Sequence, residues 1–151
     1  MQNVEQVKNM SRKKIMFLNI ICPIVVGALI YCMLSPDVIF IRKTADFIDW
    51  IYMPVFQTDC TFLKLVRNYL PDMMWGYSLV FSLFCIIGNN VADVRKVFWL
   101  AVPFTATMEI MQKTSFVPGT FDVFDIFTEF LAEAIAACII YKLYSREEFQ
   151  L

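Results

Sequence analysis

The sequence predicts an all-α membrane protein, a bundle of four transmembrane helices with one or two short interfacial helices in the first outer loop. Composition is the first indication, because 59% of the residues are hydrophobic and only 18% are charged. The mean hydropathy is +0.60. A soluble domain of 151 residues needs more polar side chains to cover its surface. The second indication is that basic residues form short clusters beside apolar runs, the arrangement that orients membrane proteins.

The chain contains four apolar runs. It has no linker and no internal repeat, so we expect a single domain over residues 1–151. A spanning helix needs about 20 apolar residues, and a proline or asparagine inside it is tolerated when the helix is packed. Gly88-Asn89-Asn90 predicts the stop after the second run, and Pro118-Gly119 a turn in the loop over 113–120. We therefore expect spans at about 15–34, 71–87, 97–111 and 121–144.

The segment 38–70 mixes aromatic and charged residues, which is typical of a helix in the membrane interface or of a re-entrant piece. The sequence leaves both possibilities open. A second short helix is predicted to begin after Asp59, a suitable N-cap. Its apolar residues follow helical spacing on one face: Phe62, Leu65, Val66 and Tyr69.

The basic residues predict that both termini lie in the cytoplasm. The predicted inner side carries Lys8, Arg12, Lys13, Lys14, Arg95, Lys96, Lys142 and Arg146. Fewer basic residues are spread over the much longer outer loops: Arg42, Lys43, Lys64, Arg67 and Lys113. The net charge of -1 gives no reason to expect a nucleic-acid partner, so the lipid bilayer is the expected partner.

The five cysteines do not form a disulfide framework, because all but Cys60 lie inside apolar runs, where cysteine acts as a small hydrophobic residue. The chain has no histidine. Zinc is therefore not expected. No cofactor is certain, but the oxygen-rich acidic residues would suit Ca²⁺ or Mg²⁺.

Acidic residues gather at the outer ends of the last three predicted spans. Asp122, Asp125, Glu129 and Glu133 are three, four and four residues apart, which places them on one stripe of a helix. At a rise of 1.5 Å per residue, Glu129 lies roughly 13 Å and Glu133 about 20 Å below residue 120, inside the hydrocarbon. An ionisable group there costs about 2.5–3.5 kcal/mol, so it indicates a functional site.

The predicted polar pocket combines this stripe with polar residues of the two preceding spans. Its members are Asp72, Tyr77, Glu109, Gln112, Asp122, Asp125, Glu129 and Glu133. The metal candidates among them are Glu109, Asp122 and Asp125. Structural alternatives stay open: Asp72 and Asp122 would each stabilise a helix dipole from a first turn. Glu129 and Glu133 would be protonated groups that hydrogen-bond between helices.

The end of the third span, Glu109-Ile110-Met111-Gln112, with Pro118-Gly119 and the block Thr120-Phe121-Asp122-Val123-Phe124-Asp125, resembles the VanZ-like membrane proteins. The likeness runs from Asn68 to the end of the chain, and its first polar segment contains Asp72 and Tyr77. Asp72 stands where that family often has histidine, and the usual loop arginine is absent. The resemblance implies a bacterial cytoplasmic membrane and a role in the cell envelope, related to glycopeptide resistance.

Three functions follow from these patterns. The leading interpretation is a non-catalytic envelope protein whose outward-facing acidic pocket binds a cation, a cationic ligand or a lipid headgroup. The alternative is an intramembrane enzyme on a lipid-linked or glycopeptide substrate, with Asp122 or Asp125 and Glu109 as acid and base. The third is a proton-coupled carrier with Glu129 and Glu133 as its relay.

Overall fold

The computed structural model describes residues 2–34, 60–114 and 121–148, and these ranges are helical apart from short turns. No strand occurs within them, so the predicted all-α class is confirmed. The interfacial or re-entrant segment expected before Asp59 and the turn at Pro118-Gly119 lie outside the described residues. The described helices are α1 (Gln2–Leu34), α3 (Thr61–Ile87), α4 (Val91–Lys113) and α5 (Val123–Glu148).

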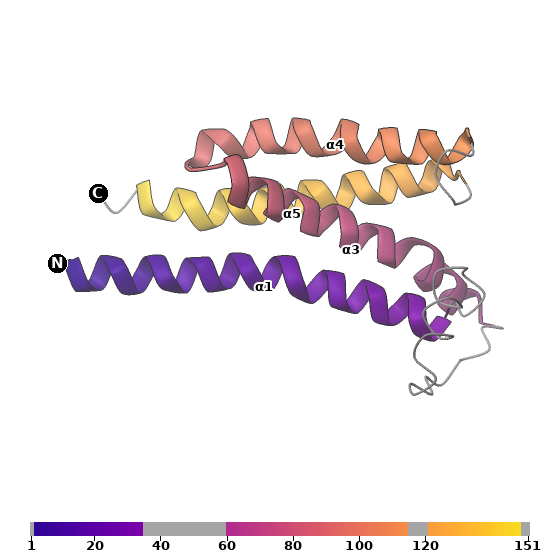
Figure 1. The fold of residues 1–151 in the computed structure, drawn as a ribbon, viewed down its shortest axis with the longest axis horizontal. Helices are drawn as coiled ribbons and strands as arrows, with labels where there is room; N and C mark the ends of the chain where they lie inside the picture. Colours follow the sequence, from indigo (N-terminus) through magenta and orange to yellow (C-terminus); the bar gives the residue numbers. More distant parts are fainter. Residues whose placement is uncertain (1, 35–59, 115–120, 149–151) are drawn as a thin grey trace.

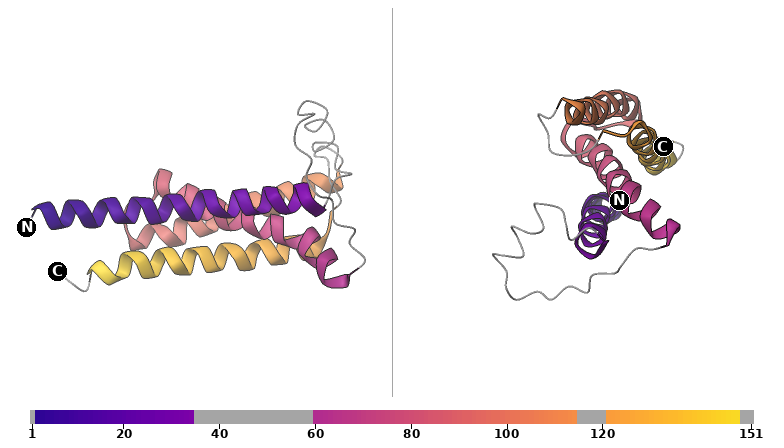
Figure 2. Two further views of the ribbon diagram at one scale, coloured as in Figure 1. Left: turned by 90° about the horizontal axis from the view of Figure 1, so that it is seen from below. Right: turned by 90° about the vertical axis from the view of Figure 1, so that its right-hand side faces the viewer.

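Helix α3 is the centre of the arrangement, because it packs against α1, α4 and α5 (Figure 1). Viewed along the bundle, α1 and α4 lie on opposite sides of α3, and α5 lies beside α3 and α4 (Figure 2). The apolar core is formed mainly where α3, α4 and α5 meet. Its fully buried members are Val80, Phe81, Phe84, Val97, Ala101, Ala136 and Ile140.

The predicted stop after the second apolar run is confirmed, because α3 ends at Ile87 and the Gly88 N–H donates to the carbonyl of Phe84. Asn90 then caps α4. Its side chain accepts from the backbone N–H of Asp93, and the Asp93 carboxylate accepts from the backbone N–H of Asn90, which completes a capping box. The turn between the two helices is therefore fixed by local hydrogen bonds.

The prediction of a separate short helix after Asp59 and a new span at Pro71 is wrong in one respect. Thr61–Ile87 is a single helix with Pro71 inside it. Proline removes one backbone hydrogen bond from a helix but is tolerated where neighbouring groups pack around it. Pro71 is buried, and a Cβ added to Gly27 of α1 would lie 3.6 Å from the Pro71 Cα. Close packing against α1 thus holds the proline-containing turn in the helix.

Two of the described helices are long and apolar enough to cross a membrane. They are Arg12–Leu34, with a mean hydropathy of 2.4, and Thr61–Ile87, with 1.5. Helices α4 and α5 do not pass this test of length and composition. Both carry several charged residues, which include Glu109, Asp125, Glu129 and Glu133. Four spans therefore stay a prediction.

The start of α1 and the end of α5 lie at the same end of the bundle, together with the turn between α3 and α4 (Figure 1). The opposite end carries the last turn of α1, the first turn of α3, the last turn of α4 and the first turn of α5 (Figure 1). Glu109, near the end of α4, and the acidic residues in the first turns of α5 belong to this second end. All five cysteines are free thiols, in agreement with the sequence prediction.

Candidate functional site

The acidic stripe of α5 faces the interior of the bundle. Asp125, Glu129 and Glu133 are 9%, 4% and 0% exposed, whereas Phe124 and Phe127 on the other face are 65% and 59% exposed. The predicted placement of these carboxylates on one helix face is therefore confirmed, and that face is the buried one. Ala132 and Ala136 are also buried, so small side chains accompany the carboxylates on the packed side of α5.

Glu133 is the deepest of these carboxylates, and α3 and α4 close over it. Its Oε1 accepts a hydrogen bond of 3.0 Å from the hydroxyl of Thr105 in α4. On the α3 side, a Cβ added to Gly76 would lie 3.5 Å from both the Glu133 Cγ and the Glu129 carbonyl oxygen. Gly76 therefore allows α3 to approach the two glutamates closely, as small residues do in membrane bundles.

Glu109 lies near the end of α4 and is 5% exposed. Its Oε1 accepts a hydrogen bond of 2.9 Å from the Gln112 side chain, one turn further along the helix. Glu109 also interacts electrostatically with Asp125 of α5 and with Asp122, which directly precedes that helix. The predicted grouping of Glu109 and Gln112 with the start of the last helix thus agrees with the structure.

Asp122 directly precedes α5 and acts as its cap. Its Oδ1 accepts a hydrogen bond of 3.0 Å from the Phe124 N–H, and its Oδ2 accepts one of 3.2 Å from the Tyr69 hydroxyl of α3. The structural interpretation of Asp122, stabilisation of a helix start, is therefore supported. Tyr69 was assigned only to an apolar stripe from the sequence, and its bond to Asp122 was not expected.

Asp72 has a different position from the one the sequence suggested. Because α3 begins at Thr61, Asp72 lies in the middle of the helix rather than in its first turn. The helix-dipole explanation for Asp72 is therefore wrong, since that effect is confined to the terminal turn. Asp72 interacts electrostatically with Asp125 and Glu109, so it belongs to the acidic group that α3, α4 and α5 share.

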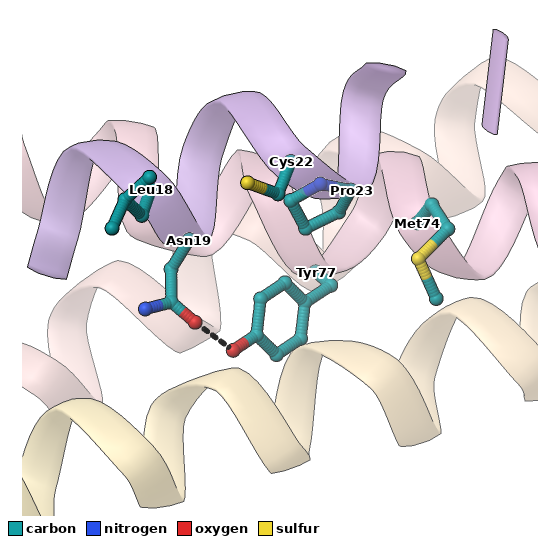
Figure 3. Close-up of a pocket in the computed structure, with 6 residues that line it drawn as sticks. All are labelled: Leu18, Asn19, Cys22, Pro23, Met74 and Tyr77. Carbon is teal, nitrogen blue, oxygen red and sulfur yellow. Dashed lines mark hydrogen bonds between the residues drawn. The ribbon is translucent and has the colours of Figure 1, made fainter. Parts of the chain in front are cut away.

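Tyr77 does not lie in this acidic group. Its hydroxyl donates to the Asn19 side-chain oxygen of α1, and both residues line a hollow of about 340 Å³ between α1 and α3 (Figure 3). Asn19 is a polar residue inside the first apolar run, and its bond to Tyr77 was not expected from the sequence. The predicted polar pocket is thus divided between the interior of α3, α4 and α5 and the seam between α1 and α3.

The buried carboxylates have fewer partners than they can bind. One oxygen of each has no hydrogen bond within the described structure: Glu109 Oε2, Asp125 Oδ1, Glu129 Oε2 and Glu133 Oε2. None of these carboxylates forms an ion pair with a described residue. The salt bridge between described residues joins Lys96 to Asp93 at 2.9 Å, at the start of α4 and far from the buried carboxylates. A buried carboxylate without a cation is costly unless it holds a proton.

The three metal candidates do not form a ready-made metal site. Within the ranges that the structure describes, no group of three or more Asp, Glu, Cys or His side chains is arranged to hold a metal ion. Glu109, Asp122 and Asp125 are near enough to interact electrostatically. The carboxylates of Glu109 and Asp122 accept hydrogen bonds from Gln112 and Phe124, whereas Asp125 is bonded to Asp122 through its backbone N–H.

Comparisons with known proteins give no relative: no family model, no curated protein and no solved structure matches this chain.

Proposed function

We propose that this chain is a VanZ-like integral membrane protein of the bacterial cell envelope, whose outward-facing acidic pocket binds a cation or a cationic headgroup. The observation that carries the proposal is the group of buried carboxylates at one end of α4 and α5. Four of them have an unpartnered oxygen and no ion pair with a described residue. Such a group lowers its free energy by taking up positive charge.

The membrane part of the proposal is supported by the surface of all four described helices. Although Glu109, Asp125, Glu129 and Glu133 are buried, large apolar side chains are exposed on α4 and α5 as well as on α1 and α3. On α4 and α5 they include Trp99, Leu100, Phe104, Ile110, Phe127, Leu131 and Ile135. A helical bundle in lipid exposes apolar side chains and keeps its charged side chains inside. Composition alone therefore underestimates how well the surfaces of α4 and α5 suit a membrane.

The orientation is supported by the basic residues. Arg12, Lys13 and Lys14 lie in the first half of α1, and Arg95 and Lys96 in the first turns of α4. Both groups belong to the part of the bundle where α1 and α4 begin and α5 ends (Figure 1). The positive-inside rule assigns that end to the cytoplasm, and the acidic pocket then opens toward the outer side.

Thermal unfolding in lipid nanodiscs, followed by tryptophan fluorescence, tests the pocket. We expect CaCl₂, MgCl₂ or ethanolamine hydrochloride to raise the Tm of the wild type above its value in NaCl at equal ionic strength. A ligand that binds only the folded state stabilises it by about 2.7 kcal/mol at a hundred times its Kd. Asp125→Asn and Glu109→Gln remove charge from the pocket and should reduce this increase.

Asp93→Asn is the matched control, because it removes a carboxylate at the opposite end of α4 and should leave the ligand-dependent increase unchanged. If the wild type, Asp125→Asn and Glu109→Gln respond identically to all three salts, the pocket binds none of these cations and the proposal fails. The salt that raises the Tm shows which kind of cation the pocket binds: CaCl₂ or MgCl₂ indicates a metal ion, and ethanolamine hydrochloride indicates an organic ammonium group.

A further inference from the structure

The seam between α1 and α3 carries a second feature that the acidic pocket does not explain. Asn19, Pro23, Gly27 and Tyr31 follow one another at intervals of four residues, so they lie on one face of α1. Gly27 packs tightly on α3, because an added Cβ would lie 3.4 Å from the Met74 Cβ. The rest of this face leaves space beside α3.

Two hollows follow the seam and have Pro23 and Met74 in common. The inner one, of about 340 Å³, contains Asn19 and Tyr77 (Figure 3). The outer one, of about 270 Å³, contains Tyr31 and Asp72. Together they form an open, mostly apolar groove on the side of the bundle, and its rim is exposed. The exposed rim residues are Leu18, Cys22, Ile24, Ala28 and Trp75.

The length of the groove corresponds to one leaflet of a bilayer. Twelve residues separate Asn19 from Tyr31, which is about 18 Å along a helix. Half of the hydrocarbon core is about 15 Å thick. Tyr31 lies one turn from the end of α1 at Leu34, at the level where aromatic residues meet the membrane interface. An acyl chain of the outer leaflet would therefore fill the groove from the Tyr31 end toward Asn19.

The charge at the outer end selects the headgroup. Asp72 has no hydrogen bond and no ion pair with any residue that the structure describes, and the charged groups that interact with it there are the carboxylates of Asp125, Glu109 and Glu129. A carboxylate surrounded by other carboxylates favours a cation and repels an anion. A primary ammonium group also supplies hydrogen-bond donors, which the Asp72 oxygens can accept.

We infer that the α1–α3 groove binds a membrane lipid with a primary amine in its headgroup: the acyl chain lies along Pro23 and Met74, and the ammonium group binds Asp72 beside Tyr31. This inference rests on the membrane placement in the proposed function. Asp72 belongs both to the acidic group and to the outer hollow, but the groove itself lies between α1 and α3. It needs no ligand at Glu109, Asp125, Glu129 or Glu133.

Native mass spectrometry of the full chain, released from detergent with added lipid, tests the groove. Phosphatidylethanolamine and phosphatidylglycerol of identical acyl chains are supplied in equal amounts, and the adducts on the protein are compared. We expect the wild type to retain the ethanolamine lipid about three- to tenfold more than the glycerol lipid, the selectivity that one partly buried ion pair gives. Asp72→Asn should bring the ratio close to one.

Ala28→Trp fills the outer hollow and should reduce both adducts, while Ala92→Trp, at the exposed start of α4, should leave them as in the wild type. Equal adducts in the wild type, a preference for the glycerol lipid, or a preference that persists in Asp72→Asn would overturn the inference. So would unchanged adducts in Ala28→Trp. If the lipid result is negative while Asp125→Asn still lowers the cation response, only the groove is wrong; the opposite pattern refutes only the acidic pocket.

Discussion

Glu133 is fully buried, and its single described partner is the hydroxyl of Thr105 on the neighbouring helix. A buried acceptor that loses its donor keeps the cost of its lost hydration. Hydrogen bonds between helices in membrane proteins are nevertheless modest, because the unfolded chain in the membrane also finds partners. The bond from Thr105 therefore has a measurable but limited effect on stability, and a useful one, since it joins α4 to α5.

We expect Thr105→Val to destabilise the protein by about 0.5–2 kcal/mol, because it replaces the hydroxyl by a methyl group of similar size and leaves Glu133 Oε1 unpartnered. Reversible unfolding in mixed micelles measures the change. Thr107→Val is the matched control: the Thr107 hydroxyl is exposed and donates to the Pro103 carbonyl in its own helix. Equal losses in the two variants would contradict a specific role for the bond to Glu133.

The sequence predicted which acidic residues share a face but not which groups they meet. Asp125, Glu129 and Glu133 are within a few residues of one another, so helical periodicity alone places them together. Tyr69 and Asp122 are 53 positions apart, and Thr105 and Glu133 are 28 apart. These contacts depend on the rotation and height of packed helices, which no local pattern determines. Thr105 in an apolar run was the available signal, since a hydroxyl there needs a partner.

At the scale of elements, Pro71 shows where local propensity is misleading. Proline after an apolar stripe predicts a helix start, yet α3 passes through it because α1 packs against the proline-containing turn. The end of α3 and the start of α4 were predictable from the sequence, because Gly88 and Asn90 form hydrogen bonds with backbone groups only three or four residues away. Local hydrogen bonds thus determine the cap of α4, whereas packing against α1 keeps α3 continuous through Pro71.

Gly76 allows a test of the contact between α3 and α5. Its added Cβ would meet the Glu129 carbonyl and the Glu133 Cγ at 3.5 Å, which is ordinary van der Waals contact. We expect Gly76→Ala to be neutral or to stabilise the protein by about 0.5–1 kcal/mol, because alanine is the better helix former. Gly76→Leu should destabilise it by about 1–3 kcal/mol through overpacking.

Unfolding of both Gly76 variants under the same conditions gives the comparison. If leucine is accepted as readily as alanine, α3 and α5 are not in close contact at Gly76.

The first turn of α4 should depend on pH. The hydrogen bond from the Lys96 side chain, followed by those from the Asn89 and Asn90 N–H groups, lowers the pKa of Asp93 below its ordinary value of 3.8. A carboxylate whose pKa is lower in the folded state contributes stability above its unfolded pKa and loses it as pH falls through the folded pKa. The contribution of Asp93 should therefore be complete at neutral pH and should decrease progressively as the pH falls below about 4.

The measurement is the Tm difference between the wild type and Asp93→Asn from pH 7 to pH 3. The wild type should be the more stable at pH 7, and the difference should shrink toward zero in acid. Because both proteins keep every other carboxylate, their shared titration cancels in the difference. A difference that is constant or that grows in acid would contradict the role of the charged Asp93.

At the scale of the whole molecule, the described helices expose many large apolar side chains and bury four carboxylates beside an apolar core, whereas a soluble bundle exposes its charged residues. The sequence indicated membrane insertion through its composition, but composition cannot tell whether a charged residue faces lipid or protein. Four acidic residues lower the mean hydropathy of α4 and α5. All four are buried: Glu109, Asp125, Glu129 and Glu133. The direction of these side chains therefore supports two more spans than composition does.

Four crossings require that the two ends of the chain share one side of the membrane and that the junction of α4 and α5 lies on the other (Figure 1). We expect a fluorescent protein fused to the C-terminus to fluoresce in the cytoplasm of a bacterial host. Alkaline phosphatase inserted after Thr114 in the full chain should be active, because its disulfides form only in the oxidising periplasm. The same enzyme fused to the C-terminus should be inactive. If α1 and α3 alone crossed the membrane, Thr114 and the C-terminus would lie on the same side, and both phosphatase fusions would give the same result.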